Sequence, residues 1–219
     1  MNSPRIALIH ATTIAIDPIK AAFESSWPEA EPVNILEDSL SPDRAKVTDI
    51  TEALTDRIVA LTKYARSTGC EAVLFTCSAF GRAIEHAATT VDIPVLKPNE
   101  AMFEAAIRKG GRTAMLYTFP PARESMEVEF REEADRLHAA ADIESILVEG
   151  AIRAVRAGDV ETHNRLVAGA AAKLEGFDAI TLAHFSTARA LKSVQAVTDI
   201  PVLTSPDAAV AKLKHLLKA

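Results

Sequence analysis

Two short turns contain the residues of this sequence whose types are suited to proton transfer. The apolar run 72–75 ends in Thr76, Cys77 and Ser78, so Cys77 falls where a strand gives way to a helix. A thiol near a helix N-terminus is favoured as thiolate, the reactive form. A free cysteine is also a common buried core residue, but the flanking hydroxyls favour a functional role. Cys70 precedes the strand, and we interpret it as structural.

The sequence contains an internal repeat, in which a second copy of one structural unit follows the first. The pentapeptide 92–96 recurs unchanged at 199–203, an offset of 107 residues. Further segments match at the same offset, namely 69–73 with 176–180, 82–83 with 189–190 and 5–9 with 112–116. One offset shared by several segments indicates an internal repeat.

The repeat selects a partner for Cys77 without reference to chemistry. Position 184, which lies 107 residues after Cys77, is His184. A lone histidine is often a satisfied, partly buried residue, but here symmetry singles out its position. A pseudo-twofold axis between the copies would bring Cys77 and His184 to opposite sides of one cleft. As a thiolate and an imidazolium, they would favour each other's charged form and titrate together.

Alternating strands and helices predict an α/β fold with parallel sheets. We expect two tandem domains related by a pseudo-twofold axis, each a parallel sheet flanked by helices, with the active site in the cleft between them. The expected domains are 1–98, joined by a C-terminal helix at 206–219, and 99–205. The expected strands are 6–9, 72–75, 95–96, 114–117, 179–182 and 202–203. The expected helices are 43–67, 79–88, 99–109, 159–174, 186–195 and 206–217, with a polar, loop-like stretch near 31–41.

Ligands of open α/β sheets bind beyond the carboxyl ends of the strands. Hydroxyl groups and helix-start N–H groups gather at these ends and predict a cradle for an anion. The candidate substrate-binding residues are Thr12, Thr13, Thr76, Ser78, Tyr117, Thr118, Ser186 and Thr187. Each taken alone is more often an ordinary cap or turn residue. His10 is the repeat equivalent of Tyr117 and is a second-tier candidate.

Composition excludes several other classes of protein. The 219 residues carry a net charge of −6 without a basic cluster, so neither nucleic acid nor an anionic membrane is an expected partner. The two cysteines lack metal-ligand spacing, and no glycine-rich phosphate loop occurs, so we expect no metal and no nucleotide cofactor. Arg5 and the apolar run 6–9 favour a buried first strand over a signal peptide. We therefore expect a cytoplasmic protein.

The sequence resembles the aspartate/glutamate/hydantoin racemase superfamily, which includes maleate isomerase and arylmalonate decarboxylase. The features that carry this resemblance are the two α/β halves, the Thr76-Cys77-Ser78 turn and the repeated Ile-Pro-Val-Leu strand. The resemblance implies cofactor-free acid–base chemistry on a small carboxylate, and a homo-oligomer. Racemases of this kind use one cysteine from each half. Cys77 matches the first, whereas His184 occupies the place of the second. The acidic residue that often marks recognition of an amino group is not evident in 10–13.

Three functions follow from these residues. The first is a cofactor-independent isomerase or racemase in which Cys77 and His184 exchange protons with the carbon next to a carboxylate. The second is a decarboxylase of substituted malonates, for which a single cysteine suffices as proton donor. The third is a protein that binds a small carboxylate without converting it.

Overall fold

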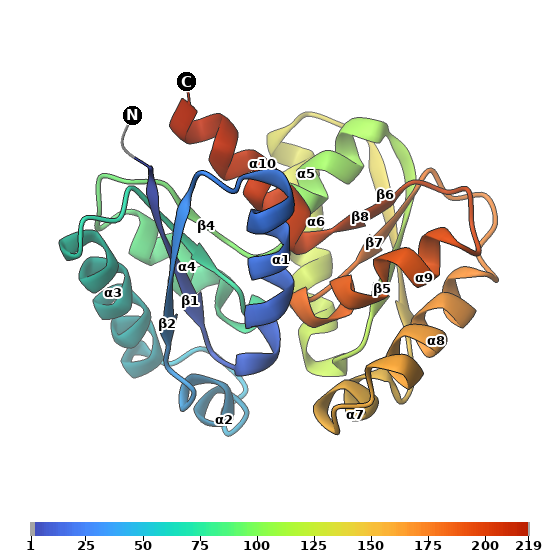
Figure 1. The fold of residues 1–219 in the computed structure, drawn as a ribbon, viewed down its shortest axis with the longest axis horizontal. Helices are drawn as coiled ribbons and strands as arrows, with labels where there is room; N and C mark the ends of the chain where they lie inside the picture. The colour runs from blue at the N-terminus through green and yellow to red at the C-terminus, as the bar shows by residue number, and fades with distance from the viewer. Residues whose placement is uncertain (1–2, 219) are drawn as a thin grey trace. The chain divides into compact units, whose positions relative to one another are not determined.

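A computed structural model describes residues 3–218 of the chain, which divides into two compact units. The first unit contains the residues up to Pro98 together with those from Ala209 onward. The second unit runs from Asn99 to Ala208. Each unit contains one parallel four-stranded sheet with helices on both of its faces (Figure 1).

The sheet of the first unit has the strand order β2-β1-β3-β4. Its strands are β1 (Arg5–His10), β2 (Glu31–Leu36), β3 (Ala72–Phe75) and β4 (Val95–Leu96). Its helices are α1 (Ile16–Ser26), α2 (Leu40–Arg44), α3 (Glu52–Ser67) and α4 (Gly81–Ala88), together with most of α10 (Ser205–Lys218). Short 3-10 helices at Thr13–Ala15 and Ser78–Phe80 follow β1 and β3.

The sheet of the second unit repeats this order as β6-β5-β7-β8. Its strands are β5 (Gly111–Tyr117), β6 (Ala141–Leu147), β7 (Ala179–Leu182) and β8 (Val202–Thr204). Its helices are α5 (Glu100–Lys109), α6 (Arg123–Arg136), α7 (Ala151–Arg156), α8 (Val160–Ala171) and α9 (Leu191–Gln195). Short 3-10 helices at Pro120–Ala122 and Phe185–Ala190 follow β5 and β7.

Successive residues of β5 supply two different cores because side chains alternate across a strand. Met115 and Tyr117 pack in a cluster with residues of α5 and α6, whereas Ala114 and Leu116 pack with residues of α7, α8 and α9. The helices accordingly lie in two layers, one on each face of the sheet (Figure 1). Burial on both faces explains why the strand is a continuous apolar run.

The pairing of the central strands confirms the repeat in three dimensions. In the first unit Ile6 of β1 pairs with Ala72 of β3, and in the second unit Thr113 pairs with Ala179. Both members of the second pair lie 107 residues after those of the first. The predicted fold class, an α/β chain of two parallel sheets flanked by helices, is confirmed.

The prediction of a loop near residues 31–41 was wrong. Glu31–Leu36 is the edge strand β2, which pairs with β1 on one side only. Glu31, Asn34 and Leu36 are exposed, so the strand has no buried apolar run. Backbone hydrogen bonds to β1 make this segment a strand, and backbone pairing does not require a pattern of apolar residues in the sequence. The equivalent edge strand β6 was not anticipated, nor were α1 and α6.

The predicted helix 43–67 begins later than expected. Thr51 caps α3, because its side-chain oxygen accepts a hydrogen bond from the Leu54 N–H at 3.3 Å. Asp43 belongs instead to the separate short helix α2. The predicted helices 79–88 and 186–195 likewise open with 3-10 turns, at Ser78–Phe80 and Phe185–Ala190.

Within residues 3–218, no helix combines the length and the apolar character needed to cross a membrane.

Two adjacent glycines allow a matched test of how β5 begins. Gly110 and Gly111 both have positive φ, +78° and +73°. A Cβ on Gly110 would meet open space, whereas one on Gly111 would lie 1.9 Å from Asp178 Oδ2. That oxygen accepts the Arg112 N–H at 2.8 Å, so it cannot move away without losing this bond.

We expect Gly110→Ala to lower the free energy of unfolding by about 1 kcal/mol through backbone strain. Gly111→Ala should lower it by at least a further ~1 kcal/mol through the added clash. Urea unfolding of the two variants measures both losses. Equal losses would show that the Asp178 contact does not restrict this position.

Candidate functional site

The sequence-predicted site residues all lie at or just beyond the carboxyl ends of the central strands. His10 ends β1, and Thr76 and Cys77 follow β3. In the second unit Tyr117 ends β5, and His184 follows β7 after one intervening residue. Because Ile9 pairs with Phe75 and Leu116 pairs with Leu182, each central pair of strands ends at the same edge of its sheet. Each unit therefore has a cluster of polar residues at one edge.

In the first unit, a chain of hydrogen bonds joins three strands at this edge. His10 Nδ1 lies 2.9 Å from Thr76 Oγ1, and His10 Nε2 lies 2.9 Å from Asn34 Oδ1. Since an amide oxygen only accepts, Nε2 donates to Asn34 and Nδ1 is an acceptor, which shares the single hydroxyl proton of Thr76 with Ile9 O, 3.3 Å from Thr76 Oγ1. Burial lowers the pKa of His10, although its bond to Asn34 acts in the opposite direction. The neutral ring therefore holds the residue next to Cys77 in place.

Cys77 is the last extended residue before the 3-10 helix Ser78–Phe80, with φ −119° and ψ 120°. It keeps some exposed surface and packs on its other side against the core cluster of α3 and α4. Burial raises the pKa of the Cys77 thiol, and this outweighs the lowering by the Ala79 N–H and by the Arg44 guanidinium. The neutral thiol is therefore the favoured form at neutral pH. Cys70 is fully buried in the same core cluster.

His184 has an unusual backbone conformation, with φ +74° and ψ 141°. L-residues rarely adopt this region, which is close to one that only glycine occupies readily. His138, at φ +51°, is the only other non-glycine residue with positive φ in the described part of the chain. Strain of this kind persists only where the surroundings enforce it, and it concentrates at functional sites. The repeat equivalent, Cys77, is unstrained.

The electrostatics of the two turns differ from the expected thiolate–imidazolium pair. Burial lowers the pKa of His184 to about 4, while burial raises that of Cys77. Both shifts favour the uncharged forms, a thiol and an imidazole, because burial penalises charge. The expectation of charged resting forms is therefore corrected: in this structure, each of the two groups is favoured in its neutral state.

Several polar side-chain atoms of the second unit are buried without a hydrogen-bond partner among the described residues, and three of them lie just beyond the carboxyl ends of β5 and β7. These three are Thr118 Oγ1, His184 Nε2 and Thr187 Oγ1. Thr118 is 1% exposed and Thr187 is 0% exposed, so water does not readily satisfy them. Buried polar groups are nearly always paired, and an unpaired one needs an explanation. These three atoms follow β5 and β7, where a ligand could supply the missing bonds.

The other predicted site residues vary in their surroundings. Ser186 is buried in the 3-10 helix after β7, and Tyr117 is 7% exposed within the core of α5 and α6. Thr12 and Ser78 are half-buried, and Thr13 is exposed. Thr12 precedes the 3-10 helix Thr13–Ala15 but makes no capping hydrogen bond with its side chain.

Two residues near Cys77 were missed from the sequence. Asn34 lies on the unanticipated edge strand β2, and Arg44 falls in a stretch predicted as the start of a long helix. The Arg44 guanidinium donates to Ala79 O at 3.1 Å and to Val47 O at 2.7 Å. No sequence motif marks either residue. Among residues 3–218, no cluster of three or more His, Cys, Asp or Glu side chains is placed to hold a metal ion.

Comparison with known proteins adds independent information. The family model described as Asp/Glu/Hydantoin racemase matches residues 6–174. No curated protein matches the chain. Among solved structures, glutamate racemase RacE1 from Bacillus anthracis is similar, with TM-score 0.77 and 14% identity, over 100% of this chain and 83% of that one. Allantoin racemase from Klebsiella pneumoniae has TM-score 0.74 and 19% identity, over 99% and 88%. Aspartate racemase from Picrophilus torridus has TM-score 0.72 and 14% identity, over 99% and 95%.

The strain at His184 predicts an inverted order of stability for two variants. Glycine ordinarily destabilises relative to alanine because it gains more freedom in the unfolded chain. At position 184, we expect His184→Gly to be more stable than His184→Ala by about 1 kcal/mol, because only glycine relieves the positive φ. Urea unfolding at neutral pH measures the difference. If the alanine variant is the more stable, the strained backbone is not a property of the folded protein.

The low pKa of His184 predicts a loss of stability in mild acid. Between the ordinary histidine value and about 4, the unfolded chain binds a proton that the folded chain does not. Stability is therefore fully present above pH ~6.5 and falls as the pH drops toward 4, by up to about 3 kcal/mol. We expect His184→Gln to lose less stability than the wild type over the same range. Urea unfolding curves of both proteins at pH ~6.5 and near pH 4 measure the two losses of stability. Equal losses in the wild type and in His184→Gln would contradict the lowered pKa of His184.

Proposed function

The chain belongs to the Asp/Glu/Hydantoin racemase family, and from this we propose that it is a cofactor-independent isomerase that inverts a carbon next to a carboxylate. Cys77 and His184 are its proposed acid and base. The observation that carries the proposal is that the two equivalent turns of the repeat hold one neutral acid and one neutral base. The opposed pKa shifts of Cys77 and His184 favour the neutral thiol and the neutral imidazole, which are the forms from which the proposed proton transfer starts.

The neutral pair supports one direction of the reaction directly. In this proposal, the His184 imidazole removes the proton from the substrate carbon, and the Cys77 thiol delivers a proton to the opposite face. One C–H bond breaks as an N–H bond forms, and one S–H bond breaks as the new C–H bond forms. The pair then stands as imidazolium and thiolate, the form that runs the reverse reaction. A reversible isomerase needs both forms.

The intermediate of this reaction carries extra negative charge on the substrate carboxylate. Hydroxyl donors that are fixed before the reaction stabilise such charge, since they need no reorganisation. The unpartnered hydroxyls of Thr118 and Thr187 are proposed to serve this purpose. In the first unit, the neutral His10 with its Thr76 and Asn34 partners offers no negative charge to a substrate ammonium group. Carboxylates without an α-amino group therefore belong in any substrate screen.

The test is conversion of single enantiomers of a carboxylate panel, followed by chiral chromatography. The panel contains aspartate, glutamate and 2-aryl carboxylates without an amino group. We expect one class to be racemised, and Cys77→Ala and His184→Gln to slow racemisation by at least ~100-fold. Cys70→Ala removes the other thiol and should keep the activity. A folded protein that converts no member of the panel, or an active Cys77→Ala variant, would contradict the proposal.

The raised pKa of Cys77 also supports a second candidate, a decarboxylase of substituted malonates. After CO2 leaves, the carbon that remains needs only one proton, and a neutral thiol can donate it. The thiolate then recovers its proton from solvent. Release of CO2 from phenylmalonate, abolished in Cys77→Ser and retained in His184→Gln, would favour this candidate. No release of CO2 by the folded wild-type protein would contradict this candidate.

A further inference from the structure

Arg44 connects the short helix α2 to the turn that carries Cys77. Its Nε donates to Ala79 O at 3.1 Å, and its second contact is Val47 O at 2.7 Å. Ala79 lies two residues after Cys77, in the 3-10 helix Ser78–Phe80. A guanidinium holds two acceptors in a rigid fork, so Arg44 links the carbonyl groups of two segments far apart in the sequence.

The same turn residue faces the Cys77 sulfur through its other backbone group. The Ala79 N–H and the Arg44 charge both lower the pKa of the Cys77 thiol, against the larger effect of burial. Arg44 is the charged side chain to which the lowering of this thiol's pKa is attributed. Moving Ala79 would therefore change the environment of the sulfur even without touching Cys77.

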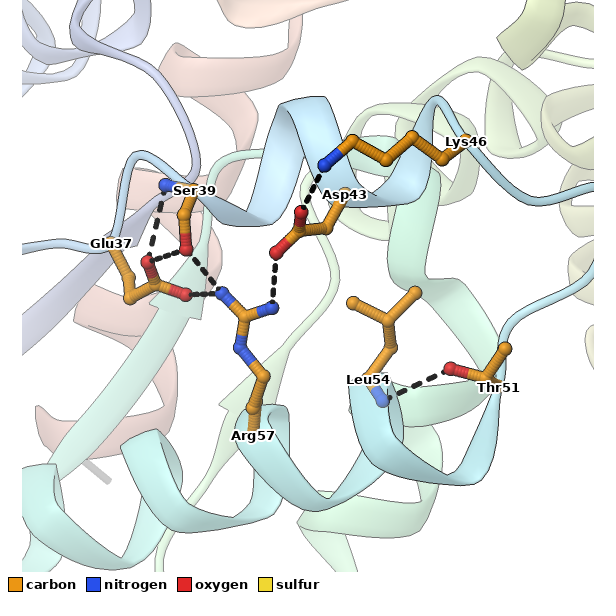
Figure 2. Close-up of polar contacts among 7 residues, drawn as sticks. All are labelled: Glu37, Ser39, Asp43, Lys46, Thr51, Leu54 and Arg57. Carbon is orange, nitrogen blue, oxygen red and sulfur yellow. Dashed lines mark hydrogen bonds and ion pairs between the residues drawn. The ribbon is translucent and has the colours of Figure 1, made fainter.

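A cluster of polar side chains connects α2 with α3 and with the segment that follows β2 (Figure 2). Arg57 of α3 lies between two carboxylates, with its Nη1 donating to Asp43 Oδ2 at 2.8 Å and its Nη2 paired with Glu37. Arg57 also donates to Ser39 Oγ at 2.6 Å, and Lys46 donates to Asp43 at 2.9 Å. Glu37, Ser39, Asp43, Lys46 and Arg57 are here called the Arg57 cluster.

The Arg57 cluster joins three elements that are adjacent to the Cys77 turn. The Glu37 N–H extends the pairing of β1 and β2 by donating to His10 O at 3.0 Å. Asp43 lies on α2, immediately before Arg44. Arg57 is on α3, whose capped first turn is also seen in Figure 2. The side chains of Glu37 and Arg57 are only 29% and 33% exposed, so the surrounding protein partly shields their pairing from solvent.

We propose that Arg44 is a positioning residue for Cys77, which fixes the Ala79 turn beside the sulfur, and that the Arg57 cluster holds Arg44 in place. The inference rests on the proposed function only in taking Cys77 as the reactive group. Its consequence is that the reactivity of Cys77 depends on a residue that does not touch the substrate and on an ion-pair cluster farther from the thiol.

The test measures the thiol itself and needs no substrate. Iodoacetamide alkylation of the folded protein is followed between roughly pH 6 and 9, with the Cys77 adduct quantified by mass spectrometry, since only the thiolate reacts. We expect Arg44→Met to slow alkylation at neutral pH by roughly three- to tenfold and to move the pH profile upward. The rates should converge only at a pH above the raised pKa of the thiol, beyond this range. Arg66→Met is the matched control, because Arg66 pairs with Asp92 through an exposed side chain.

Further variants separate position from charge. Arg44→Lys keeps the charge but cannot hold Ala79 O and Val47 O in one fork, so its rate should fall between wild type and Arg44→Met. Arg57→Met leaves Arg44 intact but releases its support, and it should also slow alkylation. If circular dichroism shows that Arg44→Met is unfolded, the alkylation profile of Arg57→Met tests the positioning role in its place. An Arg57→Met profile that matches wild type, or an Arg44→Met profile that matches Arg66→Met, would overturn the proposal. Because alkylation needs no turnover, these results are independent of whether the protein racemises any carboxylate.

Discussion

The parallel pairing of each unit's two central strands determines where every candidate site residue lies. β1 pairs with β3 and β5 pairs with β7 in the same register, so the residues that follow them reach one edge of each sheet. Mostly apolar side chains fill both faces of these strands, and the candidate polar groups gather at the turns that follow them. The repeat applies this constraint twice. It therefore makes Cys77 and His184 equivalent by position although their side chains and backbone conformations differ.

That difference separates the tasks of the two turns. In the first unit, Thr76 and His10 satisfy each other, Arg44 braces the Cys77 turn, and the thiol is held in a defined place. In the second unit, His184 is strained, and its Nε2 and two neighbouring hydroxyls have no partners within residues 3–218. A turn whose polar groups are hydrogen-bonded within the protein favours a proton donor in a fixed position. A turn whose buried polar groups lack partners favours the binding of a ligand. The cost of the unpaired groups and of the strain, on the order of 1–3 kcal/mol for each, is what a bound ligand would relieve.

Much of this fold is predictable from sequence, for a physical reason. Strands buried on both faces, such as Ala72–Phe75 and Ala179–Leu182, consist almost entirely of apolar residues, and their bounds were predicted correctly. The edge strand Glu31–Leu36 is held by backbone pairing on one side, so its polar side chains disguise it. The site follows the same rule. Their positions at strand ends identified Cys77 and His184 as candidates. The position of Arg44 beside the Cys77 turn depends on how α2 packs, and no local sequence pattern predicts that. Charge states also escaped prediction, because the burial that shifts them exists only in the folded chain.

The distribution of deuterium during turnover in D2O tests most directly whether two groups act on opposite faces. A single enantiomer of the converted carboxylate is incubated with the enzyme, and both enantiomers are analysed early in the reaction. If His184 removes one proton and Cys77 delivers another, the product should carry deuterium while the remaining substrate stays protonated. Deuterium appearing equally in recovered substrate and product would mean that a single solvent-exchanged group returns protons to both faces of the carbon, which contradicts the paired roles of Cys77 and His184.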